Sequence, residues 1–252
     1  MQFSMRQILT LILIIFHEMV LNLAWAQDNE PIAFARIRIE GVQVPEEPAL
    51  PYNRLMTFLL KNLEDVEITN AYYPTARGFL LFEHGKVDCV FPGDTNSLNP
   101  PFDIIVSEHF NMADAYLFNL AKEPLNEHNI KGKKLALLRG YVYGGNYTIL
   151  THNQVVTVNN STSAMSMLQL GRIDAFADYY LDLKRNLPPV MFEQLNYDKA
   201  TPITSVKDRL ICQSSDKTQK LINEINLLIV KMKQDGSLKQ LLGNYYGYVD
   251  NN

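Results

Sequence analysis

The chain has 252 residues, of which 47% are hydrophobic and 20% are charged, and its formal net charge is −4. This balance is that of an ordinary globular protein, and the length allows one large domain or two smaller lobes. Without a basic excess, dedicated nucleic-acid binding is not expected. The 2 cysteines are too few for a disulfide scaffold or a zinc finger.

The N-terminus has the pattern of an export signal. Arg6 precedes an apolar run over residues 8–16, and a second apolar stretch ends in a small-x-small sequence at residues 24–26. We therefore expect residues 1–26 to be a signal peptide that is cleaved after Ala26. A membrane anchor is the alternative, but His17 interrupts the apolar run well before the roughly 20 residues that a spanning helix needs.

The first half of the mature chain alternates between strands and helices. Hydrophobic patterns predict strands at residues 33–39, 66–68 and 87–91. Apolar residues spaced by three and four predict helices over residues 52–63 and 74–85. This alternation favours a mostly parallel α/β sheet.

A second set of similar units follows. Strands are predicted at residues 134–138, 155–158 and 173–177, and Ser161 can cap the helix that precedes the last of them. The C-terminal part is predicted to be helical, with a stripe of apolar residues over 221–232, a stop at Gly236 and a short last helix over residues 238–245. One sheet in each half suggests two α/β lobes.

Four phrases of the sequence, in order, resemble family 3 solute-binding proteins. Residues 76–90 (ARGFLLFEHGKVDCV) look like the first-lobe helix and strand of that family, and residues 130–140 (IKGKKLALLRG) look like its second-lobe opening. Residues 170–175 (LGRIDA) are similar to the second copy of the helix–glycine–strand phrase. Residues 233–237 (KQDGS), with Leu241 and Tyr245, resemble the C-terminal helices.

The resemblance implies a periplasmic-binding fold of the second type. In this α/β fold, two lobes, each a mostly parallel sheet flanked by helices, clamp a ligand and are joined by two crossings of the chain. On this sequence, lobe 1 would comprise residues 27–114 and 205–252, and lobe 2 would comprise residues 115–204. The crossings are expected near residues 111–116 and 202–206. Hinged lobes of this kind close around a ligand.

Ligands of open α/β sheets bind beyond the carboxyl ends of the strands. In this sequence, that rule selects the loops at residues 41–45, 92–96, 139–143 and 178–180. From these loops and the start of the first-lobe helix we take as candidate ligand-binding residues Arg139, Tyr141, Tyr143, Asp178, Tyr179, Asp94 and Arg77.

Each charged candidate has a functional and a structural interpretation. Arg139 and the backbone N–H groups of the turn after it could hold an anion, or the arginine could lie in solvent. In the family, an acid near Asp178 pairs with an amine, but here it lies one residue closer to the preceding glycine, so Tyr179 is an alternative occupant of that position. Arg77 could face the cleft or be a solvated residue at a helix start. Asp88 and Asp174, after the two helix–glycine phrases, are interpreted as structural turn residues.

One departure from the family bears on the ligand. In amino-acid binders of this family, an arginine after the third strand of lobe 1 grips the α-carboxylate of the ligand. No arginine occurs here between Arg77 and Arg139. We therefore expect standard amino acids to bind weakly or not at all, and a small polar or anionic organic molecule to be the ligand, with tyrosines packed on its apolar part.

The sequence offers no evident catalytic set. His109, beside Glu108, is the best acid–base candidate, but it falls between a predicted strand and the first crossing. No zinc-spaced histidine pair, Gly-x-Ser-x-Gly elbow or phosphate loop occurs, so we expect no metal and no cofactor. Because a few relatives are dehydratases, an enzyme remains an alternative.

The resemblance predicts a periplasmic, monomeric solute-binding protein that delivers its ligand to an ABC transporter permease. A sensory module that docks on a membrane receptor when it is closed is the other alternative.

Cys89 and Cys212 are placed in neighbouring strands by the strand order of the family. In an oxidising compartment they could form a disulfide. Both lie in apolar strands, however, and buried free cysteines are common, which favours two free thiols.

Overall fold

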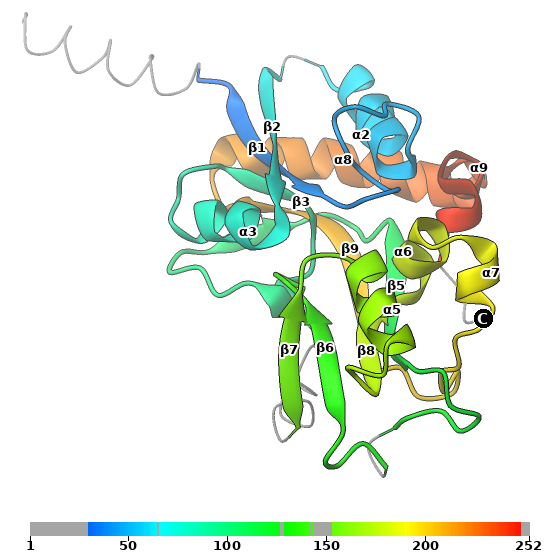
Figure 1. Cartoon of the computed structure of the whole chain (residues 1–252). Coiled ribbons are helices and arrows are strands. Elements are labelled where there is room, and N and C mark those ends of the chain that lie inside the picture. Colours follow the sequence, from blue (N-terminus) through cyan, green and yellow to red (C-terminus); the bar gives the residue numbers. More distant parts are fainter. Residues whose placement is uncertain (1–29, 65, 127–128, 142, 144–152, 248–252) are drawn as a thin grey trace, which may run out of the picture.

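The computed structural model of the chain describes residues 30–64, 66–126, 129–141, 143 and 153–247 (Figure 1). The predicted signal peptide and its cleavage site lie outside these residues, as do residues 142, 144 and 145 of the predicted anion-binding turn, which spans residues 140–145. Within the described ranges, no helix is both long enough and apolar enough to cross a membrane.

The chain forms two lobes on one curled sheet, in which the described strands have the order β2-β1-β3-β9-β5-β8-β6-β7, with β4 also paired to β9 (Figure 1). The elements of lobe 1 are β1 (Ile32–Arg38), α2 (Pro51–Lys61), β2 (Ile68–Pro74), α3 (Thr75–Glu83), β3 (Cys89–Gly93), η1 (Thr95–Ser97), β4 (Ile104–Val106), α8 (Asp216–Gln234), α9 (Ser237–Leu242) and η3 (Gly243–Tyr245). Those of lobe 2 are β6 (Lys134–Leu138), β7 (Gln154–Val158), α5 (Ser161–Gln169), β8 (Ala175–Tyr179), α6 (Tyr180–Asn186) and α7 (Pro189–Phe192).

Two strands run through both lobes, β5 (Asn111–Phe118) and β9 (Thr204–Gln213). They pair with each other antiparallel, from Asn111 opposite Asp208 to Ala115 opposite Thr204. Beyond this pair, β9 continues into lobe 1 beside β3 and β4, and β5 continues into lobe 2 beside β8. The antiparallel pair is therefore the connection on which one lobe could turn relative to the other.

Each lobe has its own core on both faces of its part of the sheet. In lobe 1, Ile32 and Phe34 of β1 pack with residues of α2, α8 and α9, whereas Ala35 and Ile37 face α3. In lobe 2, a cluster around Phe176 joins β8 to α5 and α6, and a second cluster covers the opposite face. Alternating side chains on buried parallel strands explain the continuous apolar runs in the sequence.

The predicted elements are largely confirmed, with two corrections. The strand predicted at residues 66–68 is β2 and runs from Ile68 to Pro74, directly into α3. It was predicted too short because β2 is an edge strand with mostly half-buried or exposed side chains, so it lacks hydrophobic alternation. At the start of α5 the cap is Asn160, whose side chain accepts a hydrogen bond from the backbone of Ser163, and not Ser161.

The two turn aspartates have the structural role expected of them. The carboxylate of Asp88 accepts a hydrogen bond of 2.7 Å from the backbone N–H of Ala33 in β1. In lobe 2, the carboxylate of Asp174 accepts one of 2.7 Å from the backbone N–H of Lys134 in β6. Each aspartate thus ties the turn before one strand to the start of the parallel neighbouring strand.

Cys89 and Cys212 form a disulfide, so the expectation of two free thiols was wrong. The two residues are direct partners in the antiparallel pairing of β3 and β9, with their Cα atoms 4.0 Å apart. Directly opposed residues on one face bring their side chains together. This register is a property of the sheet and is not visible in the hydrophobicity of either strand.

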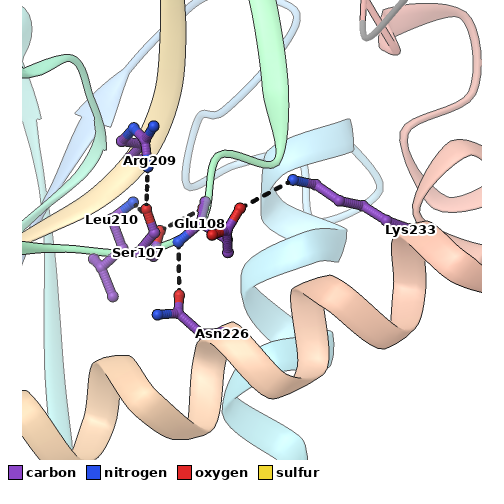
Figure 2. A network of polar contacts seen from close by, with 6 residues as sticks. All are labelled: Ser107, Glu108, Arg209, Leu210, Asn226 and Lys233. Atoms are coloured by element: carbon purple, nitrogen blue, oxygen red, sulfur yellow. Dashed lines mark hydrogen bonds and ion pairs between the residues drawn. The ribbon is translucent and has the colours of Figure 1, made fainter. Parts of the chain in front are cut away.

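A polar network holds the segment that leads into β5 (Figure 2). The backbone N–H of Glu108 donates to the side chain of Asn226 in α8 at 2.6 Å, and its carboxylate pairs with Lys233 at 3.4 Å. Arg209 of β9 donates to the backbone carbonyl of Ser107 at 2.5 Å. The start of β5 is therefore anchored to lobe 1 from two sides.

Candidate functional site

A cavity lies between the two lobes, beside the paired strands β5 and β9. The space between its walls is about 530 Å³, a volume that includes the part open to solvent. Its walls come from both lobes and are formed by Ile37, Ile39, Thr75, Phe79, Pro92, Gly93, Asp94, Ser97, Ala113, Gly140, Tyr141, Tyr179, Asp182, Val206, Asp208 and Tyr245. Most of this wall is apolar or aromatic, with the polar groups concentrated in three aspartates and three tyrosines.

The three aspartates of the wall come from three different elements. Asp94 follows β3 and caps η1, where its carboxylate accepts a hydrogen bond of 3.1 Å from the backbone N–H of Asn96. Asp208 lies in the crossing strand β9, and Asp182 lies in the first turn of α6. Asp94 and Asp182 are buried and Asp208 is half-buried, so each is shielded in part from bulk water.

Tyrosine hydroxyls hold two of these carboxylates. Asp182 accepts hydrogen bonds from Tyr245 and, at 3.2 Å, from Tyr141. Asp208 accepts one from Tyr52, whose hydroxyl oxygen in turn accepts a hydrogen bond of 2.9 Å from the side chain of Asn111. The Tyr245–Asp182 bond joins lobe 1 directly to lobe 2.

Burial makes these carboxyl groups weaker acids than usual. It raises the pKa of Asp182 to about 6 and, together with the nearby charges of Asp182 and Asp94, the pKa of Asp208 to about 7. Hydrogen bonds from the tyrosines act in the opposite direction without cancelling the effect of burial. The same burial raises the pKa of Tyr141 and Tyr245 well above 10, so both remain neutral donors near pH 7.

Positive charge is missing from this wall. Among the residues that the structure describes, no Lys, Arg or His lines the cavity. The buried Arg36 of β1 is directed elsewhere, because its guanidinium donates to Gln43 at 2.6 Å and to Asn53 at 2.9 Å. The potential inside the cavity is therefore set by carboxylates and by the dipoles of hydroxyl groups.

Three of the seven predicted site residues line the cavity, namely Asp94, Tyr141 and Tyr179. Two others are buried behind it. Tyr143 donates to the backbone carbonyl of Ala177 at 2.9 Å, and Asp178 accepts hydrogen bonds from Ser161 at 2.6 Å and from its neighbour's backbone at 2.8 Å.

Neither predicted arginine lines the inner cavity. Arg139 is exposed, donates to Asn159 at 3.1 Å and lines a separate outer groove with Arg38 and Arg185. Arg77 is exposed on α3, with its guanidinium 5.9 Å from the ring centre of Tyr73. The outer groove adjoins the cavity at Thr75 and Tyr141, which line both.

The two lobes approach each other closely at two glycines, one that lines the cavity and one that lines the outer groove. A Cβ atom added to Gly140 of lobe 2 would lie 2.8 Å from the backbone nitrogen of Ala76 in α3. One added to Gly41 of lobe 1 would lie 2.6 Å from the side-chain oxygen of Asn186 in α6. Both glycines have positive φ angles, and both let the opposite lobe approach more closely than a side chain would permit.

Sequence reasoning missed Asp182, Asp208 and Tyr245. An acid in the first turn of a helix is ordinary, so Asp182 gave no signal. Asp208 had a weak one, since a carboxylate within a β-strand is uncommon. His109, the acid–base candidate, is absent from the cavity wall, and desolvation together with the charges of Lys233 and Arg209 lowers its pKa to about 4.

Comparison with solved structures identifies the architecture. The ligand-binding core of GluR0 from Nostoc punctiforme, solved with L-glutamate, superposes with a TM-score of 0.67 at 13% identity, covering 86% of this chain and 100% of that one. An arginine transport-system periplasmic binding protein from Legionella pneumophila gives a TM-score of 0.61 at 15% identity, covering 86% and 99%. The chain has the type II periplasmic-binding fold.

Other solved structures share this type II fold. An ancestral amino-acid-binding protein, described as a precursor of cyclohexadienyl dehydratase, gives a TM-score of 0.60 at 15% identity, covering 89% of this chain and 99% of that one. No model of a protein family matches the sequence. No curated protein matches it in sequence either. At these identities the likeness concerns the fold, so the function rests on the cavity itself.

Proposed function

We propose that this chain is an exported solute-binding protein that closes its two lobes over one small organic molecule. The observation that carries the proposal is the cavity, whose wall is shared by both lobes and at whose edge Gly140 of lobe 2 meets α3 of lobe 1. A pocket at a lobe interface, mostly apolar with a few convergent polar groups, is typical of small-molecule sites. Asp94, Tyr141 and Tyr179 would contact the ligand, and Arg139 would meet only a part that reaches the mouth.

The moving parts would be the lobes as predicted, with lobe 1 as residues 27–114 and 205–252 and lobe 2 as residues 115–204. The division of the cores supports this boundary. The lobe 1 clusters end at Phe110 and resume at Leu210, whereas the lobe 2 clusters begin at Ala115 and include Leu195. If the lobes rotated about β5 and β9, Leu181 of α6 would have to leave the lobe 1 cluster and the Tyr245–Asp182 hydrogen bond would have to break.

The chain would be exported by a signal peptide cleaved after Ala26 and would act in the periplasm as a monomer. A family 3 resemblance and neighbours whose names include an amino-acid ABC transporter substrate-binding protein support delivery to a transporter permease. The alternative partner is a membrane receptor that recognises the closed form. The outer groove with Arg38, Arg139 and Arg185 joins residues of both lobes and would exist in this shape only when the lobes are closed.

Small-angle scattering tests closure directly. We would measure the radius of gyration with and without saturating amounts of alkylamines, amino acids and dicarboxylates as probes. At least one class of probe should decrease the radius of gyration and raise the melting temperature, because a ligand that binds only the folded, closed form stabilises that form. Scattering profiles that are unchanged by every probe class would contradict the proposal.

A second candidate function is favoured by one observation. Asp182 and Asp208 have pKa values of about 6 and about 7, which suit acid–base catalysis near neutral pH. A dehydratase-like enzyme on this fold would use them to move protons. Analysis of the probes by mass spectrometry after long incubation separates the two functions, because a binding protein returns its ligand unchanged.

A further inference from the structure

We propose that the inner cavity selects an organic cation, an ammonium or guanidinium group on a molecule that carries no carboxylate within the cavity. This inference rests on the proposed function and specifies its ligand class. It departs from the anionic ligand expected from Arg139, since that arginine lines the outer groove and not the cavity.

The charges of the wall point to a cation. Asp94, Asp182 and Asp208 come from a loop after β3, from α6 and from β9, so the carboxylates surround the space from both lobes. A cation between them would be attracted to lobe 1 and lobe 2 at once, which would favour the closed arrangement. Burial also raises the pKa values of Asp182 and Asp208, and a bound cation would supply the countercharge that they lack.

The aromatic walls suit the same ligand. Tyr141 and Tyr179 have ring centres 5.5 Å apart, and Tyr245 and Phe79 complete the lining. Ring faces attract ammonium and guanidinium groups, and the attraction is strongest where water is excluded. The hydroxyl groups of Tyr141 and Tyr245 donate to the two carboxylate oxygens of Asp182 and so fix its position in the wall.

No described residue of this wall carries a positive charge that would hold a carboxylate. After residue 29, the residues outside the described ranges include His128 and His152 but no Lys or Arg. A buried carboxylate without a cationic partner costs several kcal/mol, and the three aspartates would repel it further. A zwitterionic amino acid should therefore bind less well than the amine that lacks its carboxylate.

A metal ion is a poorer fit to the same charges. Among the described residues, no three His, Cys, Asp or Glu side chains lie close enough to hold one. The wall is also mostly apolar and aromatic, whereas metal sites in proteins need several oxygen, nitrogen or sulfur ligands at short range. An extended organic cation uses both the carboxylates and the ring faces.

Matched pairs of probes test the inference in the unmodified protein. Calorimetric titration at pH 7.5 would compare agmatine with arginine, cadaverine with lysine, and tyramine with tyrosine. In at least one pair the amine should bind at least about tenfold more tightly than its amino acid and should decrease the radius of gyration. Amino acids that bind as tightly as their amines, or a dicarboxylate that binds best, would overturn the inference while leaving the proposed function intact.

Variants locate the cation. Asp208→Asn keeps an acceptor for Tyr52, and Asp182→Asn keeps one of the two oxygens that accept from Tyr141 and Tyr245. Both changes remove a charge, and each should weaken the best amine about tenfold or more. Asp114→Asn is the matched control, because Asp114 of β5 accepts a hydrogen bond from Ser205 of β9 and does not line the cavity. Equal losses in all three variants would argue against the cavity. If no amine, amino acid or dicarboxylate binds at all, both the inference and the proposed function fail.

Discussion

Cys89 of β3 and Cys212 of β9 are bonded to each other across a pair of antiparallel strands and are 123 residues apart in sequence. Both are completely buried in the core of lobe 1. The bond therefore joins the part of lobe 1 that precedes lobe 2 in the chain to the part that follows it.

Replacing both cysteines by alanine should lower the free energy of unfolding by roughly 2–5 kcal/mol, because the bond closes a long loop in the unfolded chain. Urea unfolding followed by circular dichroism measures the change. In the native protein, a reductant without denaturant should leave the bond intact, since neither sulfur is exposed. Rapid labelling of both thiols in the folded protein would contradict the buried disulfide.

The contact between Gly140 and α3 predicts a closure-specific variant. Gly140→Ala should weaken binding of any probe that closes the lobes by about tenfold or more, because the new Cβ would lie 2.8 Å from the backbone of Ala76. Gly132→Ala is the matched control, since Gly132 has φ +79° against +82° at Gly140 but nothing within 4 Å of its added Cβ. Both variants carry similar backbone strain of about 1 kcal/mol, so equal affinities would contradict the rim contact.

The unliganded protein should lose stability as the pH rises from about 5 to 8. Burial raises the pKa of Asp178 to about 8, of Asp208 to about 7 and of Asp182 to about 6, all above the usual value of 3.8. A group whose pKa is raised on folding stabilises the protein below its unfolded pKa and ceases to do so above its folded pKa. The free energy of unfolding should decrease by up to about 1.4 kcal/mol per pH unit for each such proton. Asp178→Asn should flatten the upper part of this curve, and an unchanged curve would show that Asp178 is not responsible.

The affinity for an amine should increase as the pH rises from about 5 to 8, whereas the stability of the unliganded protein decreases. As Asp182 and Asp208 ionise, binding of agmatine should strengthen by up to about tenfold per pH unit for each proton displaced, while the probe itself stays protonated. The other titratable groups that face the cation are Asp94 and three tyrosines. The pKa values of Tyr141, Tyr179 and Tyr245 lie above this pH range, so these tyrosines stay neutral throughout it. Calorimetry at pH 5, 6, 7 and 8 would measure the slope, and an affinity that falls with pH would contradict the acidic site.

Arg139→Ala distinguishes the cavity from the outer groove. Because the guanidinium of Arg139 is exposed and donates to Asn159, and because alanine keeps the backbone bond to Val158, the melting temperature of the unliganded variant should be nearly unchanged. The affinity for an amine held in the cavity should change by less than about twofold. Loss of binding in this variant would place part of the ligand in the outer groove, as the arginine first suggested.

The sequence by itself determined the local structure and the architecture. Hydrophobic periodicity and turn residues located most strands and helices, because these signals depend on neighbours along the chain. The order of four phrases predicted the fold, and the rule that ligands bind beyond strand ends located Asp94, Tyr141 and Tyr179 in the cavity wall.

The tertiary structure alone decided the register and the charge of the site. Cys89 meets Cys212 because β9 returns to lobe 1 beside β3, in a register that neither strand reveals. Asp182 and Asp208 share one cavity only because α6 and β9 converge there from different lobes, whereas Arg139, adjacent to a cavity residue in sequence, faces the outer groove. The direction of a side chain and its distance from residues remote in sequence depend on packing, and packing determines which charges a ligand meets.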